Sequence, residues 1–139
     1  MTMYRLEFYE DEHGDALVHR WLREELTLPK RQALGYAMQV VLQRLGIAVC
    51  GTEFGKQLGR GLFEFRLHRD LRDSVSTGRE PRRFLFRVFC HVHGDRLILL
   101  LAGYDKAEDP SPRRQNAEIA LARARLRAWQ RRQAAPSGH

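Results

Sequence analysis

The sequence predicts an α+β domain in which an antiparallel β-sheet packs with two N-terminal helices and one C-terminal helix. Three segments in the second half of the chain alternate between apolar and other side chains, which is typical of half-buried strands. Three other segments carry apolar side chains every three or four residues, as amphipathic helices do. The expected order is β-α-α-β-β-β-α. A chain of 139 residues fits one domain, and we assign 1–133 to it and 134–139 to a disordered tail.

One strand and two helices are expected in the N-terminal part of the chain. Residues 4–10 alternate and predict a strand. A first helix is expected from Asp15 to about Leu26, and a second from Pro29 to Gly46. The apolar side of the first consists of Val18, Trp21, Leu22 and Leu26. That of the second consists of Leu34, Met38, Val41 and Leu45.

A glycine-rich segment at residues 50–61, which contains Lys56 and Arg60, separates these helices from the rest. It leads into a strand, whereas a phosphate-binding loop leads into a helix, so we interpret it as a connection. The next strands are expected at 61–69, 83–93 and 96–104. A tight turn joins the last two, which favours an antiparallel meander. The final helix is expected at about 111–133 and is rich in arginine.

Alternation places two arginines on the same face of the expected sheet. Arg66 shares its face with Glu64, and Arg87 lies on the corresponding face of the next strand. Because burying an unpaired arginine is costly, we expect the apolar faces to meet the helices and this face to stay open. Two neighbouring guanidinium groups then form a site for one phosphate. The alternative is a surface salt bridge between Glu64 and one of the arginines, and the spacing alone does not separate the two interpretations.

His91 and His93 lie two residues apart on the same expected face. A histidine pair on a strand can begin a metal site, but no third ligand is visible beside it, so we expect no metal. Proton transfer is the more natural role, because imidazole titrates near neutral pH. His68 and His19 give no signal beyond exposure to solvent.

The charge balance favours a polyanionic partner. Lysine and arginine number 24 against 17 aspartates and glutamates, a formal net charge of +7, and such an excess favours nucleic acid, anionic membranes or acidic proteins. A basic surface that serves solubility is the plainer alternative. Cys50 and Cys90 are expected to be reduced core residues of a cytoplasmic protein. No apolar run approaches the roughly 20 residues that span a bilayer, so no membrane role is expected.

Three segments between residues 56 and 129 carry a pattern found in a known family. They are KQLGRGLFEFRL, FLFRVFCHVHGDRLILLLAGYDKAEDPSP and a helix beginning NAEIALAR. Together they resemble the RelE/HigB-type toxins of bacterial type II toxin–antitoxin systems, closest to the phage-derived, HigB-like branch. The resemblance implies a RelE-like, microbial ribonuclease-like fold and a metal-independent endoribonuclease that needs no cofactor. Such a toxin cleaves mRNA, commonly on the ribosome, inhibits translation, and is held by a cognate antitoxin, expected here to be a small helix-turn-helix protein.

The resemblance also implies a catalytic set, assigned by position. Arg66 and Arg87 match the arginines of the first two meander strands, and Lys56 matches the lysine of the preceding loop. Tyr104 and Lys106 match the aromatic residue and the first lysine of the C-terminal motif. In the family, such cations orient the scissile phosphate while the ribose 2′-OH attacks it. The chain departs from the pattern at four positions around Lys106, namely Asp105, Ala107 in place of a second lysine, Glu108 and Asp109.

Further contacts to RNA are expected from four residues outside the catalytic set. They are Arg60, His91, Arg113 and Arg114. Two other functions remain open at this point. One is a non-catalytic RNA- or ribosome-binding protein of the same fold, and the other is a phage-associated interaction protein whose charge is incidental.

Overall fold

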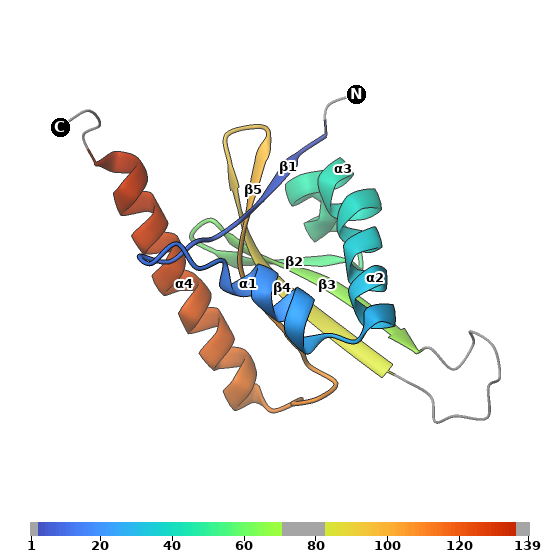
Figure 1. The fold of residues 1–139 in the computed structure, drawn as a ribbon. Coiled ribbons are helices and arrows are strands. Elements are labelled where there is room, and N and C mark those ends of the chain that lie inside the picture. The colour runs from blue at the N-terminus through green and yellow to red at the C-terminus, as the bar shows by residue number, and fades with distance from the viewer. Residues whose placement is uncertain (1–2, 71–82, 136–139) are drawn as a thin grey trace.

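A five-stranded mixed β-sheet lies at the centre of the protein, with helices on both of its faces (Figure 1). The computed structural model describes residues 3–70 and 83–135. Its strands are β1 (Arg5–Phe8), β2 (Gly55–Gly59), β3 (Leu62–Asp70), β4 (Arg83–His93) and β5 (Leu97–Asp105). Their order across the sheet is β1-β5-β4-β3-β2. The expected α+β class is therefore confirmed.

Three helical regions flank the sheet. The first is α1 (Leu17–Arg20), which continues as a π-helical turn at Trp21–Glu25. The second consists of α2 (Leu28–Ala37), a π-helical turn at Met38–Leu42, α3 (Gln43–Leu45) and a 3₁₀ turn at Gly46–Gly51. The third is α4 (Pro112–Ala134). All three expected helices are present. The rest of the expected tail, from 136 onward, and the connection at 71–82 lie outside the described residues.

The sheet is mixed, and the expectation of an antiparallel sheet is wrong at β1. This strand pairs with β5 in parallel, with Leu6 opposite Ile98 and Phe8 opposite Leu100. The pairing extends the apolar face of β5 by one strand, so it buries the apolar side chains of β1 without changing their alternation.

The glycine-rich segment is also different from the prediction, because its residues 55–59 form the edge strand β2 rather than a loop. β2 is antiparallel to β3. Glycines stand at both of its ends, and the register shifts between Gln57 and Gly59. This irregularity hides the alternation from which a strand is recognised in sequence.

The alternation of β3 and β4 is confirmed by the core that packs against the N-terminal helices. Strand residues in this core include Phe63, Phe65, Phe84, Phe86, Val88 and Cys90. Helix residues in it include Val18, Leu22, Leu34, Ala37, Met38 and Leu42. Cys90 is a buried free thiol and Cys50 a half-buried one, and burial raises the pKa of both.

On the opposite face of the sheet lies α4, so the expectation of an open face is wrong where this helix packs on the strands (Figure 1). The strands place Leu62, Phe89, Leu99 and Leu101 on this face. Left uncovered, they would form a large apolar patch in water, and α4 covers them with Ala122, Leu126 and Trp129.

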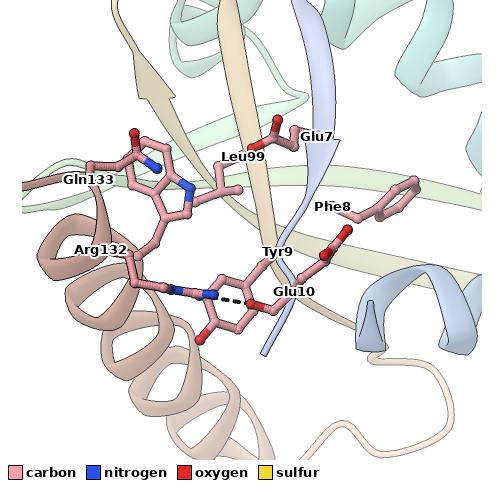
Figure 2. Close-up of a pocket in the computed structure, with 8 residues that line it drawn as sticks. Glu7, Phe8, Tyr9, Glu10, Leu99, Arg132 and Gln133 are labelled. Atoms are coloured by element: carbon pink, nitrogen blue, oxygen red, sulfur yellow. Dashed lines mark hydrogen bonds between the residues drawn. The ribbon is translucent and has the colours of Figure 1, made fainter. Parts of the chain in front are cut away.

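Arginines of α4 also hold the helix on the sheet. Arg123 donates to two backbone oxygens of the β2 end at 2.7 and 3.1 Å, and Arg125 donates to a backbone oxygen of β5 at 2.7 Å. Near the end of the helix, Arg132 donates to the Glu10 backbone oxygen at 2.8 Å and lies over the ring of Tyr9 (Figure 2). Much of the positive charge of α4 is therefore used to satisfy carbonyl groups.

One helical segment, Leu28–Gly51, is long and apolar enough to cross a membrane by length and composition alone. The expectation that no such segment exists is wrong on this measure. Leu34, Leu42 and Val49 of the segment are fully buried in the core beside the sheet, as in the core helix of a folded domain.

Candidate functional site

Arg66, Arg87 and Tyr104 form a row across three adjacent strands. Arg66 of β3 is the register partner of Arg87 in β4, and Arg87 is the register partner of Tyr104 in β5. Side chains that are directly opposite on paired strands lie on the same face and within contact distance of one another. The two arginines expected to share an anion are thus neighbours on the α4 face.

A β-bulge places Tyr104 in this row. Phe89 pairs with Ala102 and Cys90 pairs with Leu100, so Leu101 is an extra residue in β5. Strict alternation from Leu99 would turn Tyr104 toward the N-terminal helices. Because of the bulge, it instead belongs to the apolar cluster under α4. The catalytic set implied by the resemblance therefore depends on an irregularity of the strand.

Glu64 is the buried negative charge of the site, with 0% exposure. Its Oε2 accepts a hydrogen bond from Arg66 Nε at 2.5 Å and lies 3.8 Å from Arg87 Nε. The salt bridge between Glu64 and an arginine, which the sequence allowed as an alternative, therefore forms. It is buried rather than on the surface, and it involves both arginines. A buried carboxylate needs such partners, because removal from water penalises its charged form.

The site holds more hydrogen-bond donors than acceptors. Arg87 Nε is buried without a hydrogen-bond partner among the described residues, and so is the hydroxyl of Tyr104. Burial lowers the pKa of Arg87, and repulsion from Arg66 adds to this, while Glu64 opposes it. Burial also raises the pKa of Tyr104. An anion bound by Arg87 would satisfy a donor that the chain itself leaves unpaired.

A hollow of about 220 Å³ opens beside the two arginines. It is lined by Glu53, Phe54, Arg66, His68, Leu85 and Arg87. His68 was given no role from the sequence, yet it belongs to this site. The signal was present, because His68 continues the alternation of Glu64 and Arg66 by two more residues along β3.

Lys106 and Lys56 are also on this face of the sheet. Lys106 donates to Gln115 of α4 at 3.0 Å, and Gln115 in turn reaches Glu64 at 3.5 Å. Lys56 is exposed and is the register partner of Glu64. All five residues of the implied catalytic set therefore lie in or beside the arginine row.

The acidic residues near the C-terminal motif are mostly engaged elsewhere. Asp105 is buried, accepts a 2.9 Å hydrogen bond from Lys30, and accepts backbone N–H groups of Leu85 and Ala107. Burial acts to lower the pKa of Lys30, but Asp105 and then Glu108 outweigh it, and the pKa is raised. Asp105 is thus neutralised by its own partners rather than opposing the arginines.

The four expected RNA contacts are separated by the structure. Arg114 lies over the Tyr104 ring at 5.0 Å and pairs with Glu118, which puts it beside the row. Arg113 is exposed near the start of α4. His91 lies toward the other end of β4, roughly 13 Å from Arg87 by strand rise, and Arg60 lies farther still, in the turn between β2 and β3. His91 there contacts the Gly61 backbone oxygen at 2.8 Å.

A different hollow, of about 300 Å³, lies at the C-terminal end of α4 (Figure 2). Glu7 and Glu10 line it together with Trp129 and Arg132. Two carboxylates against one guanidinium, itself held by a backbone oxygen, make this hollow unsuitable for a phosphate. In residues 3–70 and 83–135 no group of three or more His, Cys, Asp or Glu side chains is arranged to hold a metal ion.

The fold and the site together define an α+β domain with a donor-rich cationic hollow at one end of its sheet. No protein-family model matches the sequence, and a search of curated proteins finds no match either.

Proposed function

We propose that the protein is a metal-independent endoribonuclease that cleaves mRNA, the RelE-like toxin of a type II toxin–antitoxin system. The observation that carries the proposal is the pair of adjacent guanidinium groups at an open hollow, with the Arg87 Nε unpaired among the described residues. Guanidinium forks bind phosphate in a bidentate manner and stabilise the charge that grows on it during reaction. The resemblance of residues 56–129 to RelE/HigB-type toxins supports the same activity.

The reaction needs only groups that the chain and the solvent supply. The ribose 2′-oxygen attacks the adjacent phosphorus and the bond from phosphorus to the 5′-oxygen breaks. The departing 5′-oxygen takes a proton from water, so the products are a 2′,3′-cyclic phosphate and a 5′-hydroxyl. Arg66 and Arg87 hold the phosphate, and Glu64 fixes their orientation. His68 lines the hollow and is the proposed acceptor of the 2′-hydroxyl proton. Lys56 and Lys106 add positive charge, and the Tyr104 hydroxyl is a free donor.

Cleavage of a defined RNA by the purified protein in EDTA tests this proposal. Arg66→Ala and Arg87→Ala should each lower the rate about 10² to 10³-fold, the effect of losing one transition-state donor. His68→Ala, which removes no ion pair among the described residues, should lower the rate while leaving RNA affinity unchanged. Arg127→Ala, on the exposed side of α4, is the control. RNA that stays intact despite tight binding would instead favour the non-catalytic RNA-binding function.

Induced expression in a bacterium tests the toxin assignment. The proposal places the protein in the cytoplasm, where it arrests growth and creates new mRNA 5′ ends, with cutting on the ribosome, as is common in the family it resembles. Growth and 5′ ends should both return to normal in folded Arg66→Ala. Growth arrest without new 5′ ends would contradict the nuclease assignment.

A cognate antitoxin is the proposed partner. A chain with a net charge of +7 and an exposed cationic hollow favours a small acidic protein, expected to carry a helix-turn-helix domain. Co-expression with the product of the neighbouring gene, followed by purification through a tag on one chain, should recover both chains and restore growth. Failure of both would contradict the toxin–antitoxin assignment and leave RNA as the partner.

A further inference from the structure

A second hollow, of about 280 Å³, adjoins the arginine site on the same face. It is lined by Arg83, Leu85, Lys106, Ala107, Glu108 and Pro110. Leu85 lines both hollows, and its backbone oxygen accepts the Lys106 N–H at 2.7 Å. A chain bound by the arginines can therefore continue into the second hollow without leaving the surface.

The chemistry of this second hollow differs from that of a phosphate site. Its apolar lining comes from Leu85, Ala107 and Pro110, while Arg83 and Lys106 supply positive charge. An apolar surface beside cations suits a nucleotide of an RNA chain, because the base can pack on the apolar surface while the flanking phosphates lie near the cations. Ala107 is important here because a longer side chain at this position would enter the hollow.

Glu108 supplies the polar group that can read the edge of a base. Its side chain is 72% exposed, and its Oε1 lies 3.4 Å from Lys30 Nζ. The closer partner of Lys30 is Asp105, at 2.9 Å. The Glu108 carboxylate thus keeps most of its acceptor capacity. Guanine is the base that presents two adjacent N–H donors, on N1 and N2, to one carboxylate.

We propose that the hollow at Leu85, Ala107 and Glu108 is a nucleobase subsite that selects guanine next to the phosphate bound by Arg66 and Arg87. This inference rests on the proposed function, since it needs RNA at the arginine site. It assigns Glu108 as a specificity-determining residue and explains why an alanine, rather than a second cation, stands at 107.

Binding of short, non-cleavable RNA tests the subsite without requiring catalysis. The probes are 2′-O-methyl pentanucleotides of uridine that carry one central guanosine, inosine, adenosine or uridine. The full-length protein should bind the guanosine probe about tenfold more tightly than the adenosine and uridine probes, as expected for one bidentate base contact. Inosine lacks the N2 amino group and should fall between guanosine and uridine.

Glu108→Gln should reduce the preference for the guanosine probe to about onefold without lowering the affinity for the all-uridine probe. Glu12→Gln, an identical change in charge at an exposed position of the loop after β1, should keep the preference. Ala107→Lys should remove the preference by filling the hollow while retaining affinity for the all-uridine probe. It serves as the second variant if Glu108→Gln does not fold.

The outcomes separate the inference from the proposed function. If no probe binds, or if Arg87→Ala leaves binding unchanged, the proposed function fails and the subsite fails with it. If all probes bind equally through Arg87, the proposed function stands and the guanine subsite is overturned. A guanosine preference that survives in both folded Glu108→Gln and folded Ala107→Lys also overturns it.

Discussion

Glu64 is the residue on which the electrostatics of the site depend. Its carboxylate is removed from water, while Arg66 is 33% exposed and Arg87 13% exposed. The two positive charges lie on adjacent strands and would repel each other if the carboxylate were absent. Glu64 therefore holds the guanidinium groups together, and because the exposed Glu53 also lines the hollow, the excess positive charge of the site comes from Lys56 and Lys106 beside the row.

Glu64→Gln should destabilise the protein by about 3 kcal/mol, the lower end of the range for breaking a buried ion pair, because Arg66 is partly solvated. Urea unfolding gives the free energy of unfolding for this comparison. Glu12→Gln is the matched control and should change it by less than about 0.5 kcal/mol. Inorganic phosphate should stabilise Glu64→Gln more than the wild type, because it replaces the lost negative charge. Equal stabilisation of both would argue against anion binding between the arginines.

At the scale of elements, the hairpin between β2 and β3 contains a strained residue. Gly59 pairs with Leu62, which leaves Arg60 and Gly61 as a two-residue turn with φ of +55° and +81°. Two positive φ angles are the requirement of a type I′ turn, and arginine adopts this region only with strain. Arginine does not favour the backbone conformation of this turn. Its presence there is consistent with a functional role for its exposed side chain.

Arg60→Gly should therefore raise the free energy of unfolding by about 0.5 to 1 kcal/mol, because glycine adopts a positive φ without strain. Thermal and urea unfolding measure the gain. Arg60→Ala removes the same side chain but keeps the strain, so it should bring no gain. If Arg60 binds RNA, both variants should lose affinity equally. A stabilised Arg60→Ala would show that the side chain, and not the backbone, is unfavourable.

The N-terminus of α4 sets the position of Arg114 and Gln115 beside the site. Ser111 Oγ accepts the Arg114 N–H at 3.1 Å, which is the capping hydrogen bond of the helix. Ser111 also donates from its hydroxyl to Asp109 at 2.7 Å and from its backbone at 3.2 Å. These two hydrogen bonds, the hydroxyl one first, lower the pKa of Asp109.

Ser111→Ala should cost about 1 kcal/mol of stability through loss of the cap. Asp109 should lose its main hydrogen bond, so its pKa should rise toward 3.8, which an NMR titration can follow. A lowered carboxyl pKa contributes stability above the unfolded value and loses it as pH falls through the folded value. The difference between wild type and variant should therefore shrink below about pH 3.8. Thr27→Ala is the control, because Thr27 precedes α2 without a side-chain capping bond. A loss of similar size in both variants would contradict the assignment of the cap.

At the scale of the whole molecule, the net charge of +7 overstates the number of cations available to RNA. Arg123, Arg125 and Arg132 of α4 donate to backbone oxygens and hold the helix on the sheet. The cations that surround the proposed phosphate site are Lys56, Arg66, Arg87 and Lys106. We therefore expect RNA to contact few phosphates, and to do so on the face of the sheet.

The salt dependence of RNA binding tests this count. Three or four phosphate contacts to a single strand predict a slope of log K against log salt between about −2 and −3, or a loss of roughly 20 to 50-fold between about 50 and 200 mM salt. Arg87→Ala should make the slope shallower by about 0.7, and Arg127→Ala should leave it unchanged. A slope far steeper than −3 would mean that RNA binds along α4 instead.

Much of the fold and part of the site follow from local patterns in the sequence. Alternation identifies β3, β4 and their buried faces, and helical spacing identifies all three helical regions. The same alternation puts Arg66 and Arg87 on one face, where they are indeed register partners. These features are predictable because the periodicity of a strand or helix is a property of neighbouring residues.

Pairing between distant segments was decided only by the tertiary structure. The parallel position of β1, the strand β2 and the cover of α4 over the sheet each depend on which surfaces are left to bury after the meander forms. The extra residue Leu101 turns Tyr104 to the arginine face, and Glu64 is buried among Arg66, Arg87 and Gln115, which come from three different elements. A single sequence records the period of each element, but register, bulges and the second face of a sheet are set by contacts between elements far apart in the chain.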